Sequence, residues 1–479
     1  MTPGSPAKPL IPEILQKAIV GGYPHRSQRP GAKGKITSEL VRKIFSGEGL
    51  HMRLATSASW ILAASVAALS PQARAITGTS GKTCDVRAYG AKGDGVTKDT
   101  AAIQSAIDAC TANKAGGTVK LSGGTFVSGP IHLKSNITLD VEKDATLLGS
   151  PDRADFPAGT FAHLPTVQPL VGSLNAENIV VTGGGTIDGN GQLWWDYVKS
   201  VRNSGVLGTD HPRPMLLVFD HSKHIRVEGI TVQNSGFWQI VPYYSDDLQF
   251  RNLRILAPRS PNTDAIDPFS SSNIVIDHVF SSVGDDNIAI KSGAIDSPGP
   301  DDPSRNITIT DCTFENGHGL SIGSEISGGV QNVHAERIHF KGTDQGIRIK
   351  SNRDRGHDVS NISFKDLDMV DVKTAIQISE YYPKVYPEGD VAAAPIGRLT
   401  PFFHGFTIEN LHATGSTTAG VIIGLPESPV KDLVLKNVDI QAATGMKIAY
   451  AQVTFDNVKV VTADGSGIQV SPTATVTGK

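Results

Sequence analysis

A seven-residue pattern of apolar and polar positions recurs along most of the chain. Its second, fourth and seventh positions are apolar, and copies begin at residues 178, 224, 247, 273, 306, 332, 361, 405 and 432. Each copy predicts a short strand with alternating side chains, followed by a turn and a second strand. A single copy cannot bury its apolar face, whereas stacked copies share one core. The pattern therefore predicts an all-β fold, a right-handed parallel β-helix.

The second strands of four successive repeats carry polar residues in register. Aligning these strands, which would lie about 4.8 Å apart, places four residues in one column: Asp264, Asp286, His318 and Gln345. Asp285 directly precedes Asp286. A buried core has no use for crowded carboxylates, and crowding raises the pKa of at least one of them. That carboxyl could donate a proton near neutral pH while its neighbours stay ionised, which predicts an acid/base catalyst.

Cations are expected beside the acids. Strand alternation turns one set of side chains inward and another outward: Ile288, Leu320 and Ile347 inward, and Lys291, Arg348 and Lys350 outward. The outward cations would share the strip that carries the acids. Two interpretations remain open, because these cations could bind an anionic substrate or only neutralise the acids.

The remaining segments predict an end cap and long loops. An amphipathic helix from about Thr100 to Thr111 would cover the first coil, since a solenoid must protect its open sheet edge. We expect this cap in residues 76–130 and the β-helix in 131–479. Longer, aromatic-rich segments interrupt the coils at about 151–175, 191–215 and 383–404. They either form the walls of a cleft or anchor the loops on the solenoid.

A secretory signal peptide is predicted inside the chain, at residues 52–75. A basic residue, a short apolar stretch and an A-x-A site follow Met52 in that order. We interpret Met52 as the true start and 1–51 as an upstream mis-extension, and we expect a secreted or periplasmic protein that begins near Ile76. The alternative is a basic cytoplasmic tail with a short anchor.

Charge and cysteine content narrow the possible partners. The formal net charge of −3 gives no electrostatic reason to expect nucleic acid or an acidic membrane surface. None of the three cysteines lies in a cluster with zinc-ligand spacing, so we expect no metal. Cys84 and Cys110 could form a disulfide or be two buried small side chains, and Cys312 is expected in the core.

Four ordered blocks resemble the signature motifs of glycoside hydrolase family 28, the polygalacturonases. They are NTDAIDP (262–268), GDDNIAIKSG (284–293), GHGLSIGSE (317–325) and GIRIKS (346–351). The segment YGAKGDGVTKDTAAIQSAID is also similar to the cap of bacterial members, and the resemblance covers most of residues 84–470. It implies a single-stranded, pectin-lyase-like right-handed β-helix. It also implies hydrolysis of α-1,4-linked galacturonan with inversion, without a metal or other cofactor.

The resemblance also implies roles for individual residues. By motif, Asp285 is similar to the general acid, Asp264 and Asp286 to the pair that activates water, and His318 to the residue that maintains protonation of the acid. Substrate-binding residues are expected as well: Arg348, Lys350, Lys291, Asn262 and Tyr381, with Tyr382 as the alternative tyrosine. Ala265 and Asn287 replace the usual Gly and Cys of the family, but neither change removes a reacting group.

Other functions remain open at this point. The substrate could be xylogalacturonan or rhamnogalacturonan rather than plain galacturonan, and the sequence does not decide between endo and exo attack. A calcium-dependent pectate lyase or a non-catalytic glycan-binding solenoid would share the fold. The expected partner is a pectic polysaccharide, and the expected oligomeric state is a monomer. Adjacent coils bring carboxyls closer than the about 6.5–9.5 Å usual for inverting glycosidases, so inversion rests on the resemblance alone.

Overall fold

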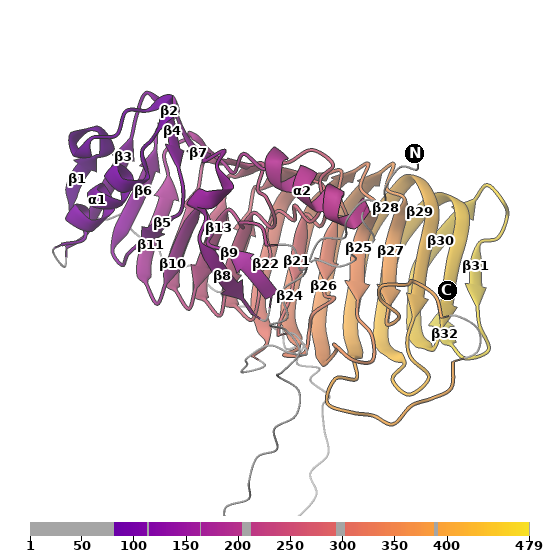
Figure 1. The fold of residues 1–479 in the computed structure, drawn as a ribbon. Helices are drawn as coiled ribbons and strands as arrows, with labels where there is room; N and C mark the ends of the chain where they lie inside the picture. Colours follow the sequence, from indigo (N-terminus) through magenta and orange to yellow (C-terminus); the bar gives the residue numbers. More distant parts are fainter. Residues whose placement is uncertain are drawn as a thin grey trace, which may run out of the picture. The chain divides into compact units, whose positions relative to one another are not determined.

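The computed structural model describes residues 81–112, 115–162, 164–203, 212–293, 302–387 and 391–478. These residues form a right-handed parallel β-helix (Figure 1), which confirms the predicted fold. All nine repeats form consecutive parallel strands of one face: β11 (Glu177–Thr182), β14 (Lys223–Glu228), β17 (Asp246–Arg251), β19 (Ser272–Asp277), β22 (Ser304–Glu315), β24 (Val330–Lys341), β26 (Asp358–Val370), β28 (Phe402–Ile423) and β29 (Val430–Ala449).

Equivalent residues of these strands stack in columns through the core. Ile274 of β19 pairs with Ile307 of β22, which pairs with Val333 of β24, and all three are buried. Cys312 pairs with Ile338 and is buried, as expected. Each turn of the chain therefore adds one layer of apolar side chains to a continuous core. The same face begins with β1 (Lys82–Asp85), β3 (Gly117–Leu121) and β6 (Ile137–Val141), and it ends with β30 (Ala451–Thr462) and β32 (Thr475–Gly478).

Shorter strands form the two other faces. One face contains β2 (Asp94–Lys98), β4 (Gly124–Ser128), β7 (Ala145–Gly149), β12 (Thr186–Asp188), β15 (Thr231–Gln233), β18 (Arg254–Leu256) and β20 (Phe280–Ser282). The short strand β31 (Ile468–Val470) belongs to the remaining face, because it pairs with the last residues of β29. The other, called the front sheet here, contains β5 (Ile131–Leu133), β10 (Val171–Leu174), β13 (Leu217–Asp220), β16 (Ile240–Tyr243), the bridged segment 266–269, β21 (Ile288–Ile290), β23 (Leu320–Ile322), β25 (Gln345–Lys350) and β27 (Thr374–Ser379). All predicted acid residues lie on or beside the front sheet.

A helix covers the start of the solenoid. Helix α1 (Thr100–Cys110) follows the short 3-10 helix η1 (Val86–Tyr89) and packs against β1, β3 and β5, with Ile103 and Ile107 buried. The expected amphipathic helix is thus present. Cys84 and Cys110 form a disulfide, which resolves the alternative that the sequence left open.

Asparagine side chains link successive coils in a ladder. The Nδ2 of Asn306 donates to Asn273 Oδ1 (3.0 Å), Asn332 donates to Asn306 (3.1 Å), and Asn361 donates to Asn332 (2.7 Å). All four residues have positive φ near 57°, a left-handed conformation that Asn tolerates better than most residues. The ladder therefore stabilises both the turns and their stacking.

Two inserted segments lie against the solenoid. Helix α2 (Gln192–Asn203) buries Trp194 and Trp195, and the indole Nε1 of Trp195 donates to the Ser235 carbonyl (2.9 Å). These tryptophans therefore anchor the insertion. The 3-10 helix η2 (Arg153–Asp155) precedes an antiparallel hairpin of β8 (Ala158–Phe161) and β9 (Leu164–Val167), which lies over the front sheet (Figure 1).

Among the described residues, no helix is long and apolar enough to cross a membrane. The predicted signal peptide at 52–75 and the preceding residues 1–51 lie outside the described part of the chain.

Candidate active site

The front sheet brings the predicted polar column together. Ile266 bridges Ile288, Ile288 pairs with Leu320, and Leu320 pairs with Ile347. Two residues before each of these lie Asp264, Asp286, His318 and Gln345. The observed pairing therefore has the expected register.

Three carboxylates meet at this point. An oxygen from each of Asp264, Asp285 and Asp286 lies within 4.8 Å of the others. Asp264 is only 3% exposed and the Asp286 side chain only 1%, whereas 25% of the Asp285 side chain is exposed. Asp285 is therefore the carboxyl of the three that a large substrate can reach.

Asp286 is held ionised by its partners. Its Oδ2 contacts the Nζ of Lys350 (2.7 Å), while Oδ1 accepts from Arg348 Nη1 (3.0 Å) and Ser321 Oγ (2.7 Å). Burial alone would raise the pKa of Asp286, but Lys350 and Arg348 overcome this effect and hold the pKa well below its usual value.

Asp264 shares its buried environment with a fourth acid, Asp267. Burial raises the pKa of Asp264 well above its usual value, and the charge of Asp267 raises it further. The pKa of Asp267 is raised in the same direction by burial, although Lys291 opposes the shift with its Nζ 3.9 Å from Oδ1. Burial and mutual repulsion therefore favour the protonated form of these two carboxyls, in the direction that crowding predicts.

His318 lies between Asp285 and the next coil. Its Nδ1 is 3.1 Å from Gln345 Oε1, and because an amide oxygen only accepts, Nδ1 carries a hydrogen. Its Nε2 is 3.8 Å from Asp285 Oδ1. Asp344 also faces Nδ1, at 3.6 Å. The imidazole is thus oriented so that its second nitrogen faces the exposed acid.

The three predicted cations lie in the same cleft with different partners. Lys350 is 6% exposed and is occupied by Asp286, whereas Arg348 is 14% exposed and its Nε has no hydrogen-bond partner among the described residues. Lys291 contacts Glu325 Oε2 (3.3 Å), and its Nζ lies over the Trp238 ring at 5.0 Å. The unpartnered Nε is itself buried, but Arg348 is the most exposed of the three cations and therefore the one that a substrate reaches most easily.

Lys291 and Glu325 stabilise each other's charge. Burial opposes ionisation of both groups, yet the attraction to Glu325 raises the pKa of Lys291. The same pair, with help from Arg355 at 3.2 Å, lowers the pKa of Glu325 to about 2. This pair extends the charged cleft beyond the acids.

Asn262, Tyr381 and Tyr382 contact different partners around the cleft. Asn262 Oδ1 accepts from Arg202 and Arg213, both at 3.0 Å, so it fixes two arginines beside the acids. Tyr382 faces the cleft, with Lys350 Nζ 5.5 Å from its ring centroid. The charge that acts most strongly on the Tyr381 hydroxyl is instead that of Arg353. The structure therefore favours Tyr382 over Tyr381 as the cleft tyrosine.

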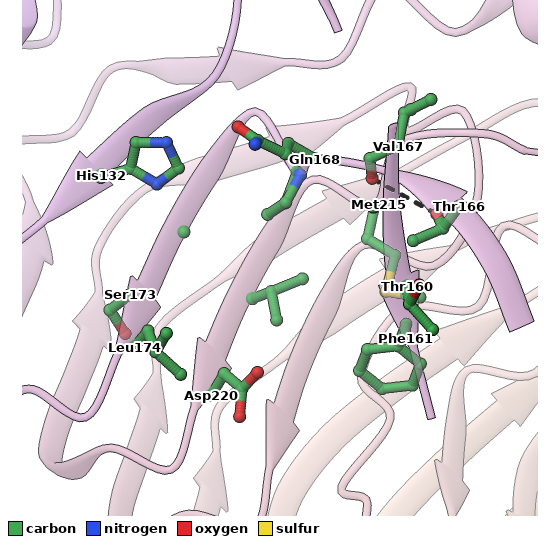
Figure 2. A pocket seen from close by; sticks show the side chains of 14 residues that line it. His132, Thr160, Phe161, Thr166, Val167, Gln168, Ser173, Leu174, Met215 and Asp220 are labelled. Atoms are coloured by element: carbon green, nitrogen blue, oxygen red, sulfur yellow. Dashed lines mark hydrogen bonds between the residues drawn. The ribbon is translucent and has the colours of Figure 1, made fainter. Parts of the chain in front are cut away.

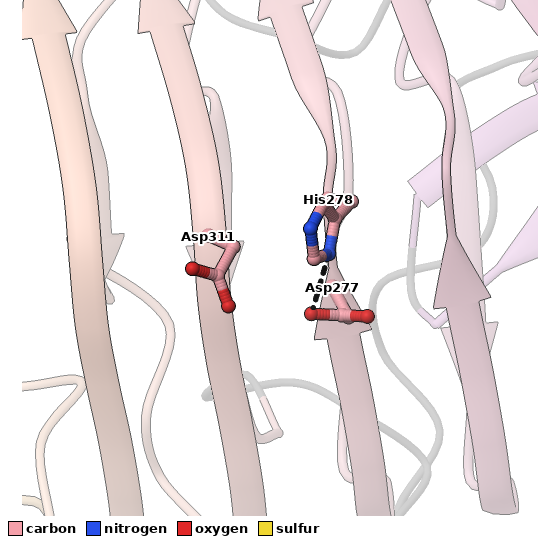
Figure 3. Close-up of side chains that lie close together, drawn as sticks. All are labelled: Asp277, His278 and Asp311. Atoms are coloured by element: carbon pink, nitrogen blue, oxygen red, sulfur yellow. Dashed lines mark ion pairs between the residues drawn. The ribbon is translucent and has the colours of Figure 1, made fainter.

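A second group of titratable residues lies elsewhere. Asp277 and His278 of β19 and its turn lie close to Asp311 on β22 (Figure 3). Arg337 binds both oxygens of Asp311 at 2.7 Å, and Asp277 pairs with His278 at 3.0 Å. These charges are already paired at the surface.

Three residues of the cleft were not among the sequence predictions: Asp267, Trp238 and Glu325. The signal for Asp267 was available, because it follows inward-facing Ile266 and must turn outward. Trp238 and Glu325 lie outside regular strands, where alternation gives no direction.

Comparison with known proteins places the chain in a family. The sequence model of glycosyl hydrolases family 28 matches residues 105–467. A protein named "Probable polygalacturonase" from Vitis vinifera is 30% identical over 408 residues, 81% of this chain and 79% of its own. An endo-polygalacturonase from Pectobacterium carotovorum subsp. carotovorum is 30% identical, over 73% of this chain and 86% of its own.

A solved structure agrees with these relatives. The exopolygalacturonase from Thermotoga maritima is 28% identical and has a TM-score of 0.64, with 83% of this chain and 92% of the other covered. The family match spans most of the β-helix, including all the strands that carry the acid cluster. The chain therefore belongs to glycoside hydrolase family 28 and is a pectin-degrading glycosidase.

Proposed function

We propose that this enzyme is a polygalacturonase that hydrolyses α-1,4-galacturonosyl linkages with inversion. The observation that carries the proposal is the contrast among the three acids. One carboxyl is exposed, while the two beside it are buried, and one of these is held ionised by cations. A glycosidase requires this division of labour, with a donor for the leaving oxygen and a base for the attacking water.

Asp285 is the proposed general acid. It is the accessible carboxyl, so it can approach the glycosidic oxygen and protonate it as the bond breaks. His318 Nε2 lies 3.8 Å from Asp285 Oδ1, so a small movement brings the imidazole into position to return a proton to this carboxyl. His318 thus maintains the acid between turnovers.

Asp286 and Asp264 are the proposed water-activating pair. Asp286 stays ionised over a wide pH range and can take a proton from water. Asp264 has an oxygen within 4.8 Å of Asp286, so its carboxyl can orient the same water by a hydrogen bond. Because the oxygens of the three acids lie within 4.8 Å of one another, closer than in most inverting enzymes, inversion is supported by family membership rather than by spacing.

The cations favour a uronate substrate. Arg348 is the most exposed of the three cations, and guanidinium groups bind carboxylates strongly. We propose that Arg348 binds the galacturonate carboxylate, with Lys291 adding positive charge and Tyr382 lining the subsite, while Lys350 acts through Asp286. Every proposed residue comes from one chain, so a monomer is sufficient for the site.

The test is the hydrolysis of polygalacturonate. We expect new reducing ends without absorbance from unsaturated products, no loss of rate on adding a chelator, and the inverted anomer as the first product by NMR. Unsaturated products with loss of activity on chelation would instead identify a calcium-dependent lyase. Binding without cleavage of galacturonan, xylogalacturonan or rhamnogalacturonan would identify a glycan-binding solenoid.

A further inference from the structure

Side chains on the outer surface of the front sheet are covered in the coils before the acid cluster, and one column of them is partly exposed in the coils after it. Val241 follows inward-facing Ile240 and so points outward, yet it is fully buried. Val218, Trp238 and Tyr243 are also buried. They form an apolar cluster separate from the solenoid core. Something must therefore cover the coils that precede Asp264.

The β8–β9 hairpin provides this cover. The ring of Phe161, at the end of β8, lies 4.4 Å from the Tyr243 ring, 5.7 Å from Phe269 and 5.9 Å from Trp238, measured between centroids. Phe269 belongs to the same coil as Asp264, because Ile266 and Phe269 bridge to the next strand together. The hairpin therefore reaches, along the solenoid axis, the coil that carries Asp264, although Phe269 itself lies further along that coil than Asp264.

The hairpin is fixed in this position by several contacts. The backbone N–H of Gln168 donates to the Pro157 carbonyl (2.9 Å) and closes the base of the hairpin. Thr166 Oγ1 donates to the Arg213 carbonyl (2.8 Å). Phe156, which precedes β8, packs edge-on against Trp194 of helix α2. These contacts make the hairpin a fixed wall.

A cavity of about 250 Å³ lies between the hairpin and the first strands of the front sheet (Figure 2). His132 and Ser173 line it from β5 and β10, and Phe161 lines it from the hairpin. The hairpin thus separates this cavity from the acid cluster, and the cleft does not continue as an open groove past Asp264.

In the opposite direction one column of side chains stays at least partly exposed, although the outward-facing Gln377 and Val421 of the same coils are buried. Gln345 pairs with Thr374, Thr374 with Thr418, and Thr418 with Thr444. Each of these side chains is at least partly exposed. They continue the column that begins with Asp264, Asp286 and His318. A row of hydrogen-bonding groups therefore leads from the acids toward the carboxyl-terminal coils, where a sugar chain could lie.

We propose that the β8–β9 hairpin makes this enzyme exo-acting. This inference rests on the proposed hydrolysis of galacturonan. A chain enters along the open row of threonines, and its end meets the wall that Phe161 forms. Because the wall reaches the coil of Asp264 along the solenoid axis, only a short stretch of the sugar chain fits beyond the cleaved bond. The relatives include proteins named as endo and as exo enzymes, so their names do not decide this question.

The first experiment uses the wild-type enzyme and long polygalacturonate. We expect one short product, of one or two units, from the earliest time points, and viscosity that falls slowly relative to the reducing ends formed. A ladder of intermediate oligomers at early times would overturn the exo inference and leave the proposed function intact. No cleavage of any pectic substrate would overturn the proposed function and this inference with it.

Two variants test the role of the hairpin. Phe161→Ala removes the aromatic wall, and replacement of residues 159–166 by two glycines removes the hairpin while keeping its base. We expect either change to yield mixed oligomers and to halve the viscosity after several-fold fewer cuts. Phe402→Ala is the control, since Phe402 is an exposed aromatic residue at the start of β28, outside the front sheet, and its product pattern should match the wild type. Folding of each variant is checked by circular dichroism. An unchanged single product in a folded hairpin variant would overturn the proposal.

Discussion

Replacing Lys350 by Met separates the two roles that a cation can have in this cleft. Lys350→Met keeps an unbranched apolar stem but removes the ammonium that lies 2.7 Å from Asp286 Oδ2. Breaking a buried ion pair costs about 3–5 kcal/mol. We expect the ionised form of Asp286 to lose about 3 kcal/mol of stabilisation, the lower end of that range, because Arg348 and Ser321 still contact Asp286.

The sign of the pH effect follows from Asp286. The pKa of Asp286 is depressed in the folded state. Its contribution to the free energy of unfolding is therefore present above the unfolded-state pKa of about 3.9, and it is lost as the pH falls through the folded-state pKa. Without Lys350 the pKa of Asp286 rises, and the ionised base disappears at a higher pH. At about 1.36 kcal/mol per pKa unit, about 3 kcal/mol corresponds to roughly two units, so the acidic limb of the kcat/KM profile should move to higher pH by up to about two units, with little change at neutral pH.

The assay is kcat/KM from acid to neutral pH on galacturonan and on its methyl ester. We expect equal slowing on both substrates, because Lys350 acts through Asp286. Lys436→Met is the matched control, since Lys436 forms an exposed pair with Glu409 at 2.9 Å and such pairs are worth about 0–1 kcal/mol. An unshifted pH profile, or a selective loss on galacturonan alone, would refute the reasoning and assign Lys350 to uronate binding.

Three further outcomes are expected. Arg348→Gln should reduce the preference for galacturonan over its methyl ester roughly tenfold or more, as a charged contact is worth about 1.5–3 kcal/mol; a preserved ratio of kcat/KM values would contradict uronate binding. Asp285→Asn should lower kcat about 10²- to 10⁴-fold, and near-normal turnover would remove Asp285 from the acid role. Amino-terminal sequencing of exported protein should begin near Ile76, whereas a mature form that retains residues 1–51 would refute the signal-peptide prediction.

The repeats were predictable because a β-helix repeats a local rule. Alternation within each strand decides which side chains enter the core, and the seven-residue pattern aligns one coil with the next. The same alignment predicted from the sequence alone that Asp264, Asp286 and His318 lie in one column. Asp267 obeys the same rule and could have been found from its position after Ile266.

The inserted segments were not predictable in this way. The hairpin from 158 to 167 has no repeated counterpart, and its position depends on contacts of Phe161 with residues far along the chain. Tyr381 and Tyr382 are adjacent in a turn after β27, where alternation no longer tells which ring faces the cleft. Which partner Lys350 takes is likewise a matter of three-dimensional distance.

The asparagine ladder fixes the register of the coils that carry the acids. Asn306 and Asn332 each donate to one neighbour and accept from another, so each is tied to both adjacent coils. A slip of one residue would turn every side chain of a strand to the opposite face. The ladder thus keeps neighbouring coils in register, so the alignment of the cleft residues depends on amide side chains that lie outside the front sheet.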